Sequence, residues 1–163
     1  SEDIRNVILD KANTEMDPRT EALLYAASRR QHIVEKIIPA IKAGKVVLCD
    51  RYLDSSLAYQ GGARELGIEE IYNVNLYATE GMQPDVTLLF DIEPEEGLAR
   101  IAANAGREVN RLDVEKISFH HKVRESFKKV AAMFPERFVT IDASKTPDEV
   151  FNDSFNAIKK ILK

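Results

Sequence analysis

The order of apolar and polar positions along the chain predicts helices alternating with short strands. Apolar residues at helical spacing predict a helix close to the N-terminus and further helices over 18–42, 68–80, 94–101, 113–133 and 147–161. Short apolar runs rich in β-branched residues predict buried strands at 46–49, 85–92 and 138–141. This alternation is typical of a three-layer α/β sandwich with a parallel sheet.

The stretch over 46–60 combines a predicted strand with candidate chemistry. Val46 to Cys49 reads as a strand buried on both faces, and Asp50-Arg51 follows it directly. In open α/β sheets the carboxyl ends of the strands are where ligands bind. A helix that Gly61-Gly62 should end comes next, and three polar side chains share one of its faces: Ser56, Tyr59 and Gln60. The alternative interpretation of this stretch, without a function, is a surface salt bridge followed by an amphipathic helix.

Length, composition and charge narrow the classes of protein. At 163 residues, 44% hydrophobic and 31% charged, the chain fits one globular domain. A net charge of −4 disfavours nucleic-acid binding. The single cysteine, Cys49, excludes an internal disulfide and is expected in the core. Neither a membrane-spanning run nor a signal peptide is visible, so we expect no membrane and a cytoplasmic location.

Two motifs carry a resemblance to a known family. Asp50-Arg51-Tyr52 followed by Ser55 to Gln60, together with the segment over 18–30, resembles bacterial thymidylate kinase, which phosphorylates dTMP with ATP. Residues 107–113, within a segment at about 104–113, resemble its lid, and residues 141–144 its last strand and loop. The resemblance implies a P-loop nucleoside monophosphate kinase fold, one domain over 1–163 and a homodimer.

The resemblance also implies roles for individual residues. Four would be catalytic: Asp50, Arg51, Arg107 and Arg111. Arg51 would clamp the transferring phosphoryl group, Asp50 would hold Mg²⁺ or its water, and the other two would approach the ATP phosphates from the lid. Six would bind dTMP: Arg5 at its phosphate, Tyr25 stacked on thymine, Arg29 and Gln60 at the polar edge of the base, Ser56 in support and Tyr59 against the deoxyribose. Asp142 and Ala143 would lie near the adenine of ATP.

One expected motif is not in the sequence. A phosphate-binding loop of the form G-x-x-x-x-G-K-[ST] does not occur, and in the family it lies in an N-terminal portion with the first strands. We therefore expect those N-terminal strands to be absent and the 163-residue chain to be inactive. A deoxynucleoside kinase, or a non-catalytic fragment that binds dTMP or a partner chain, remain alternatives.

Overall fold

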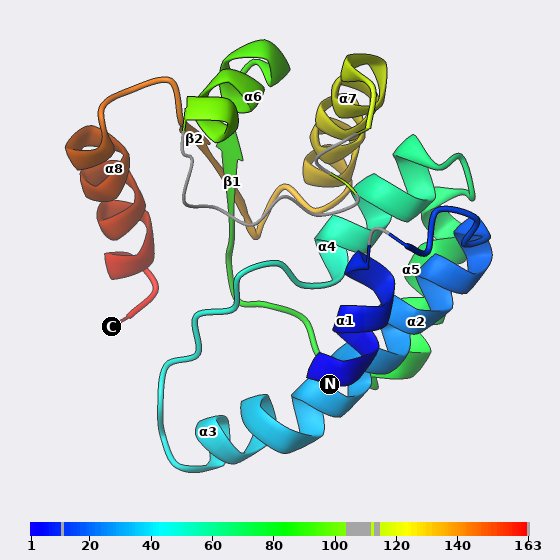
Figure 1. Cartoon of the computed structure of the whole chain (residues 1–163). Helices are drawn as coiled ribbons and strands as arrows, with labels where there is room; N and C mark the ends of the chain where they lie inside the picture. Colours follow the sequence, from blue (N-terminus) through cyan, green and yellow to red (C-terminus); the bar gives the residue numbers. More distant parts are fainter. Residues whose placement is uncertain (11, 104–111, 113–114, 163) are drawn as a thin grey trace.

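Two parallel strands form the sheet in the part of the chain that this computed structural model describes, residues 1–10, 12–103, 112 and 115–162. β1 (Thr87–Asp91) pairs with β2 (Phe138–Asp142) in a register that runs from Thr87 opposite Phe138 to Asp91 opposite Asp142. Figure 1 shows α8 on one side of these strands and α4, α5 and α7 on the other. The predicted α/β class with a parallel sheet is confirmed.

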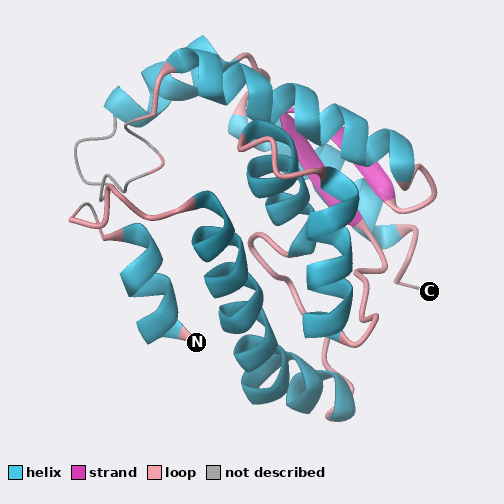
Figure 2. Ribbon diagram, turned by 90° about the vertical axis from the view of Figure 1, so that its right-hand side faces the viewer, coloured by secondary structure: helices cyan, strands magenta, loops and turns pink. Residues whose placement is uncertain are grey.

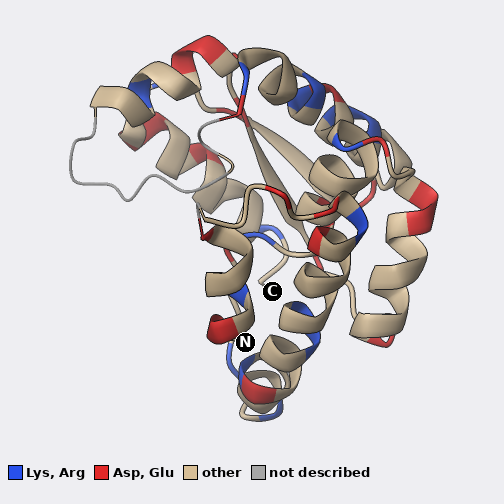
Figure 3. Cartoon of the chain, turned by 45° about the vertical axis from the view of Figure 1, so that its right-hand side comes forward, with Lys and Arg blue, Asp and Glu red and all other residues tan. Residues whose placement is uncertain are grey.

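Helices make up most of the described chain (Figure 2). In order they are α1 (Glu2–Leu9), α2 (Pro18–His32), the π-helix η1 (Ile33–Ile37), α3 (Ile38–Lys42), α4 (Leu53–Ser56), the π-helix η2 (Leu57–Ala63), α5 (Ile68–Thr79), α6 (Pro94–Ala103), α7 (Ile117–Met133) and α8 (Pro147–Lys159). Acidic and basic residues are interspersed along them (Figure 3), as is usual for solvated helical faces.

The predicted helix over 18–42 is confirmed as one continuous run, from α2 through η1 to α3. The Asp17 carboxylate caps its start by accepting hydrogen bonds from the backbone N–H groups of Arg19 and Thr20. Pro39 lacks a backbone N–H, and the helix widens into a π turn just before it. Gly44 ends the run in the left-handed conformation at φ 71°.

The prediction of a buried strand at Val46 to Cys49 is wrong for the described structure. The segment is a loop, Val46 and Leu48 are 62% and 80% exposed, and Cys49 is exposed as well. A parallel strand needs a hydrogen-bonded neighbour, and β1 pairs only with β2 among the described residues. The run has strand-like composition, but its backbone has no ladder to join.

The prediction that Gly61-Gly62 ends the central helix is also wrong, because η2 continues to Ala63. Both glycines lie where η2 packs closely on other helices. A Cβ on Gly61 would lie 2.9 Å from the Cα of Ile68 at the start of α5, and a Cβ on Gly62 would overlap the side chain of Ser126 on α7. The pair therefore permits close packing and does not act as a helix stop.

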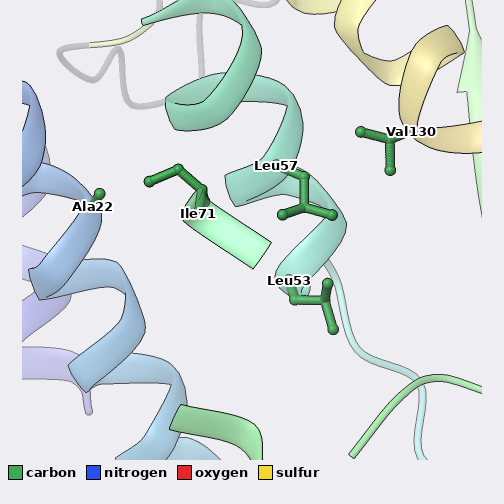
Figure 4. Packing of buried hydrophobic residues seen from close by; sticks show 5 residues of the cluster. All are labelled: Ala22, Leu53, Leu57, Ile71 and Val130. Carbon is green, nitrogen blue, oxygen red and sulfur yellow. The ribbon is translucent and has the colours of Figure 1, made fainter. Parts of the chain in front are cut away.

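Five buried apolar residues from five helical segments form the core cluster in Figure 4: Ala22, Leu53, Leu57, Ile71 and Val130. They come from α2, α4, η2, α5 and α7 in that order. Burial of apolar surface is the dominant favourable contribution to folding, so this cluster stabilises the packing of these segments. The cluster fixes the α4–η2 segment against α2.

A buried ion pair ties the same segment to the sheet. Arg137, just before β2, donates to both carboxylate oxygens of Asp54 on α4, at 2.7 and 2.6 Å. The side chains are 8% and 5% exposed, and Thr87 of β1 donates to the same carboxylate at 2.9 Å. The guanidinium also lies 4.5 Å from the ring centroid of Phe134. The start of α4 is thus held relative to both strands.

Candidate active site

Two hydrogen bonds connect α2 to the α4–η2 segment and define the centre of the candidate site. Arg29 of α2 donates to the Ser56 hydroxyl at 2.9 Å, and Gln60 of η2 donates to the Glu21 carboxylate at 2.8 Å. On α2, residues 21, 25 and 29 are spaced four apart and share one face. Tyr25 therefore lies between the two connections, near three other predicted dTMP-binding residues.

Arg29 is held by several neighbours at once. Its guanidinium donates to the backbone carbonyl of Tyr52 at 3.2 Å and to the side-chain carbonyl of Asn75 on α5. Loss of hydration on burial lowers the pKa of Arg29 to about 10, so the group stays charged at neutral pH. A buried guanidinium with fixed partners suits recognition of a carbonyl oxygen.

Arg51 has an unusual backbone conformation for a residue with a side chain. Its φ of 66° lies in the left-handed region, which is a strained state often found at functional sites. The guanidinium stacks over the Tyr59 ring, 4.9 Å from its centroid, and donates to the Tyr59 hydroxyl at 3.2 Å. The structure thus brings Arg51 and Tyr59 together directly.

The remaining described site residues occupy more open positions. Asp50 is exposed beside Arg51, and Arg5 is exposed on α1, which packs next to α2. The structure therefore leaves Asp50 accessible to a metal ion and Arg5 accessible to an anion. Arg107, Arg111 and nearly all of the predicted lid at 104–113 lie outside the described residues.

Asp142 is the last residue of β2 and Ala143 follows it, beside a pocket of about 310 Å³ at the carboxyl ends of the strands. Asp91, Thr140, Asp142 and Ser144 are among the residues that line it. The Asp142 carboxylate accepts hydrogen bonds from the N–H and hydroxyl of Ser144, which lower its pKa. This edge of the sheet is the place where ligands bind in α/β proteins.

Two buried positioning residues were missed in the sequence. Glu21 is 1% exposed and holds Gln60, and Asn75 is 1% exposed and holds Arg29. The sequence contains a pattern that could have identified each of them. Glu21 has helical spacing with Tyr25 and Arg29, and Asn75 interrupts the apolar stripe of α5. Polar residues on a buried helical face require partners, and here the partners are predicted site residues.

A parallel α/β fold with a charged segment before α4 and a tyrosine–arginine cluster beside it is typical of the nucleotide kinase class. The Thymidylate kinase family model matches residues 1–154. The chain belongs to the thymidylate kinase family.

Several curated relatives agree with this assignment. The thymidylate kinase of Geobacillus sp. (strain WCH70) is 60% identical over 97% of this chain and 75% of its own length. That of Bacillus velezensis is 59% identical over 100% of this chain and 77% of its own length, and that of Clostridium novyi is 58% identical over 94% and 75%. These matches lend no support to the expectation of an inactive chain, which stays a prediction.

No helix among the described residues has both the length and the apolar character that crossing a membrane requires.

Proposed function

We propose that this protein transfers a phosphoryl group from ATP to dTMP, giving dTDP and ADP. Family membership supports the reaction, and the observation that carries the substrate is the arrangement of Tyr25 between two polar connections. A ring on α2 flanked by a guanidinium and an amide suits a flat base with a polar edge. The alternative of a deoxynucleoside kinase differs in its acceptor, which would be a hydroxyl group and not a phosphate.

For phosphoryl transfer the protein has mainly to align the two substrates and to neutralise the charge on the phosphoryl group. A nucleotide phosphate is already ionised near neutral pH, so the acceptor needs no dedicated general base. Arg51 would neutralise charge on the phosphoryl group in transfer, and Arg5 would bind the phosphate of dTMP. Arg107 and Arg111 are proposed to act from a lid at 104–113, and Asp142 and Ala143 to lie near adenine.

Asp50 is the residue that we propose for Mg²⁺. Its carboxylate is exposed and offers the hard oxygen ligand that Mg²⁺ prefers. The described residues contain no group of three or more His, Cys, Asp or Glu side chains arranged to hold a metal. A single carboxylate suits Mg²⁺, which commonly binds through one or two carboxylates together with substrate phosphates. When bound, the ion neutralises phosphate charge.

We also propose a single domain, a cytoplasmic location and a homodimer. An apolar groove between α2 and α5, lined by Leu23, Leu66 and Val74 among others, supports a helix-packed dimer. Leu23 is 59% exposed there. Leu23→Glu should shift the protein toward monomer in sedimentation velocity, because a buried charge at the interface would be unpaired.

The function is tested by offering dTMP and thymidine separately, with ATP and Mg²⁺, and measuring ADP formation and nucleotide binding by calorimetry. Phosphorylation of dTMP but not thymidine supports the proposal, and preference for thymidine favours the alternative. Binding of dTMP without turnover by the 163-residue polypeptide agrees with the expectation that it is inactive. Absence of both binding and turnover refutes the proposed function.

Arg29→Ala tests the base-binding role within the same experiment. Loss of its donors would leave a buried acceptor on the base unpaired, so dTMP binding should weaken about five- to 150-fold. Arg30→Ala on the next position of α2 is the control, because Arg30 pairs with Glu80 at the surface.

A further inference from the structure

The contact between Glu21 and Gln60 determines whether the Gln60 side-chain amide presents its carbonyl oxygen or its N–H₂ group to the site. Glu21 is 1% exposed and Gln60 is 2% exposed, so both polar groups are buried. The amide nitrogen of Gln60 lies 2.8 Å from Glu21 Oε1. A carboxylate can only accept hydrogen bonds, so the amide must turn its N–H₂ group toward Glu21. Its carbonyl oxygen then points away from Glu21.

A cation also contacts this carboxylate and holds it in place. Arg64, one turn beyond Gln60, lies 3.6 Å from Glu21 Oε2, while Gln60 occupies Oε1. Arg64 is itself anchored by Glu115 at 2.6 Å and by the ring of Phe119, 4.5 Å from its centroid. A buried carboxylate that has both a counter-charge and a hydrogen bond resists rotation.

We propose that Glu21 is a specificity-determining residue, which fixes the Gln60 amide so that its carbonyl oxygen accepts the ring N–H of a thymine-type base. The inference rests on the proposed function, because it assumes that the base lies against Tyr25 between the two connections. Glu21 acts through Gln60 and is a positioning residue.

The two pyrimidine types differ at the atom that this oxygen would meet. Thymine carries a hydrogen on N3 and has carbonyl oxygens on either side of it, whereas N3 of cytosine is an acceptor beside an amino group. A fixed carbonyl oxygen pairs with the N–H of thymine and faces the lone pair of cytosine, which leaves two acceptors opposed. An amide free to rotate would present its N–H₂ group to cytosine instead. Rejection of cytosine therefore depends on the orientation being fixed.

The test is calorimetric binding of dTMP and dCMP to the wild-type protein, Glu21→Gln and the exchanged pair Glu21→Gln with Gln60→Glu. A glutamine at 21 can either accept from or donate to Gln60, so the orientation is no longer fixed. The preference for dTMP over dCMP, measured as the ratio of dissociation constants, should fall at least about tenfold. In the exchanged pair the carboxylate at 60 can only accept, so the preference should return.

Glu80→Gln is the matched control, because Glu80 is a surface carboxylate that also pairs with an arginine of α2. It should leave the ratio unchanged. A merely structural role of Glu21 would reduce the fraction of binding-competent protein for both nucleotides alike, without changing the ratio.

Wild-type preference retained by a folded Glu21→Gln protein overturns the inference. If Glu21→Gln does not fold, as judged by circular dichroism, the exchanged pair decides: wild-type preference supports the inference, and loss of preference overturns it. Wild-type protein that binds neither nucleotide refutes the proposed function, and that result differs from either outcome for the variants.

Discussion

Replacing Arg137 with alanine should lower the free energy of unfolding by about 3–5 kcal/mol. Both side chains of the pair it forms with Asp54 are less than a tenth exposed, and the bidentate contact joins positions 83 residues apart in the sequence. Removing the guanidinium leaves the Asp54 carboxylate buried without its cation, although the Thr87 hydroxyl still donates to it. The loss also removes the stacking on Phe134.

The assay is urea denaturation followed by circular dichroism, supported by thermal unfolding. For a chain of this length a loss of this size corresponds to a decrease of roughly 6–20 °C in the melting temperature. Lys145→Ala provides the matched control, because Lys145 and Asp153 form a pair at 2.8 Å with both side chains more than 40% exposed. The control should cost less than about 1 kcal/mol.

A double variant separates the value of the pair from the penalty of a lone charge. Arg137→Met with Asp54→Leu removes both charges, so it should be far more stable than Arg137→Ala alone. The reasoning is refuted if Arg137→Ala costs no more than Lys145→Ala, or if the double variant is as unstable as the single one.

Three further outcomes are expected. In a protein that turns over dTMP, Arg51→Ala should abolish most turnover while dTMP binding measured by calorimetry survives, because its proposed partner is charge on the transferring phosphoryl group; near-normal turnover would contradict the assignment. Hydrogen bonds from Arg124 lower the pKa of Asp91, so this pair stabilises the protein above about pH 4 and loses its contribution as the pH falls through the depressed pKa. Arg124→Met should therefore differ from wild type in urea denaturation most near neutral pH and least at about pH 2; an equal difference at both would count against it. Gly62→Ala should lower the free energy of unfolding by about 1–3 kcal/mol through overlap with Ser126, and Ser126→Gly should restore part of the loss in denaturation experiments. No rescue would show that the strain lies elsewhere.

Local features of this protein were readable from the sequence because their causes are local. Asp17-Pro18 begins α2, Gly44 ends α3, and Thr146 with Glu149 forms the predicted capping box of α8. The side chains of Asp17 and Thr146 accept hydrogen bonds from backbone N–H groups two or three residues further on, and Gly44 adopts the left-handed conformation that ends a helix. The shared face of Tyr25 and Arg29 on α2 follows from helical spacing in the same way.

Tertiary structure decided the features that depend on a distant neighbour. The apolar run at 46–49 has strand composition but no paired strand beside it, and Gly61-Gly62 continues a helix because α5 and α7 approach closely there. Arg29 finds its partner Asn75 on α5, and Gln60 finds its partner Glu21 on α2. Both contacts cross the core. The hydrogen bonds of Gln60 and Arg29 join residues 39 and 46 positions apart, and no periodicity in a single segment encodes which distant residue will be the partner.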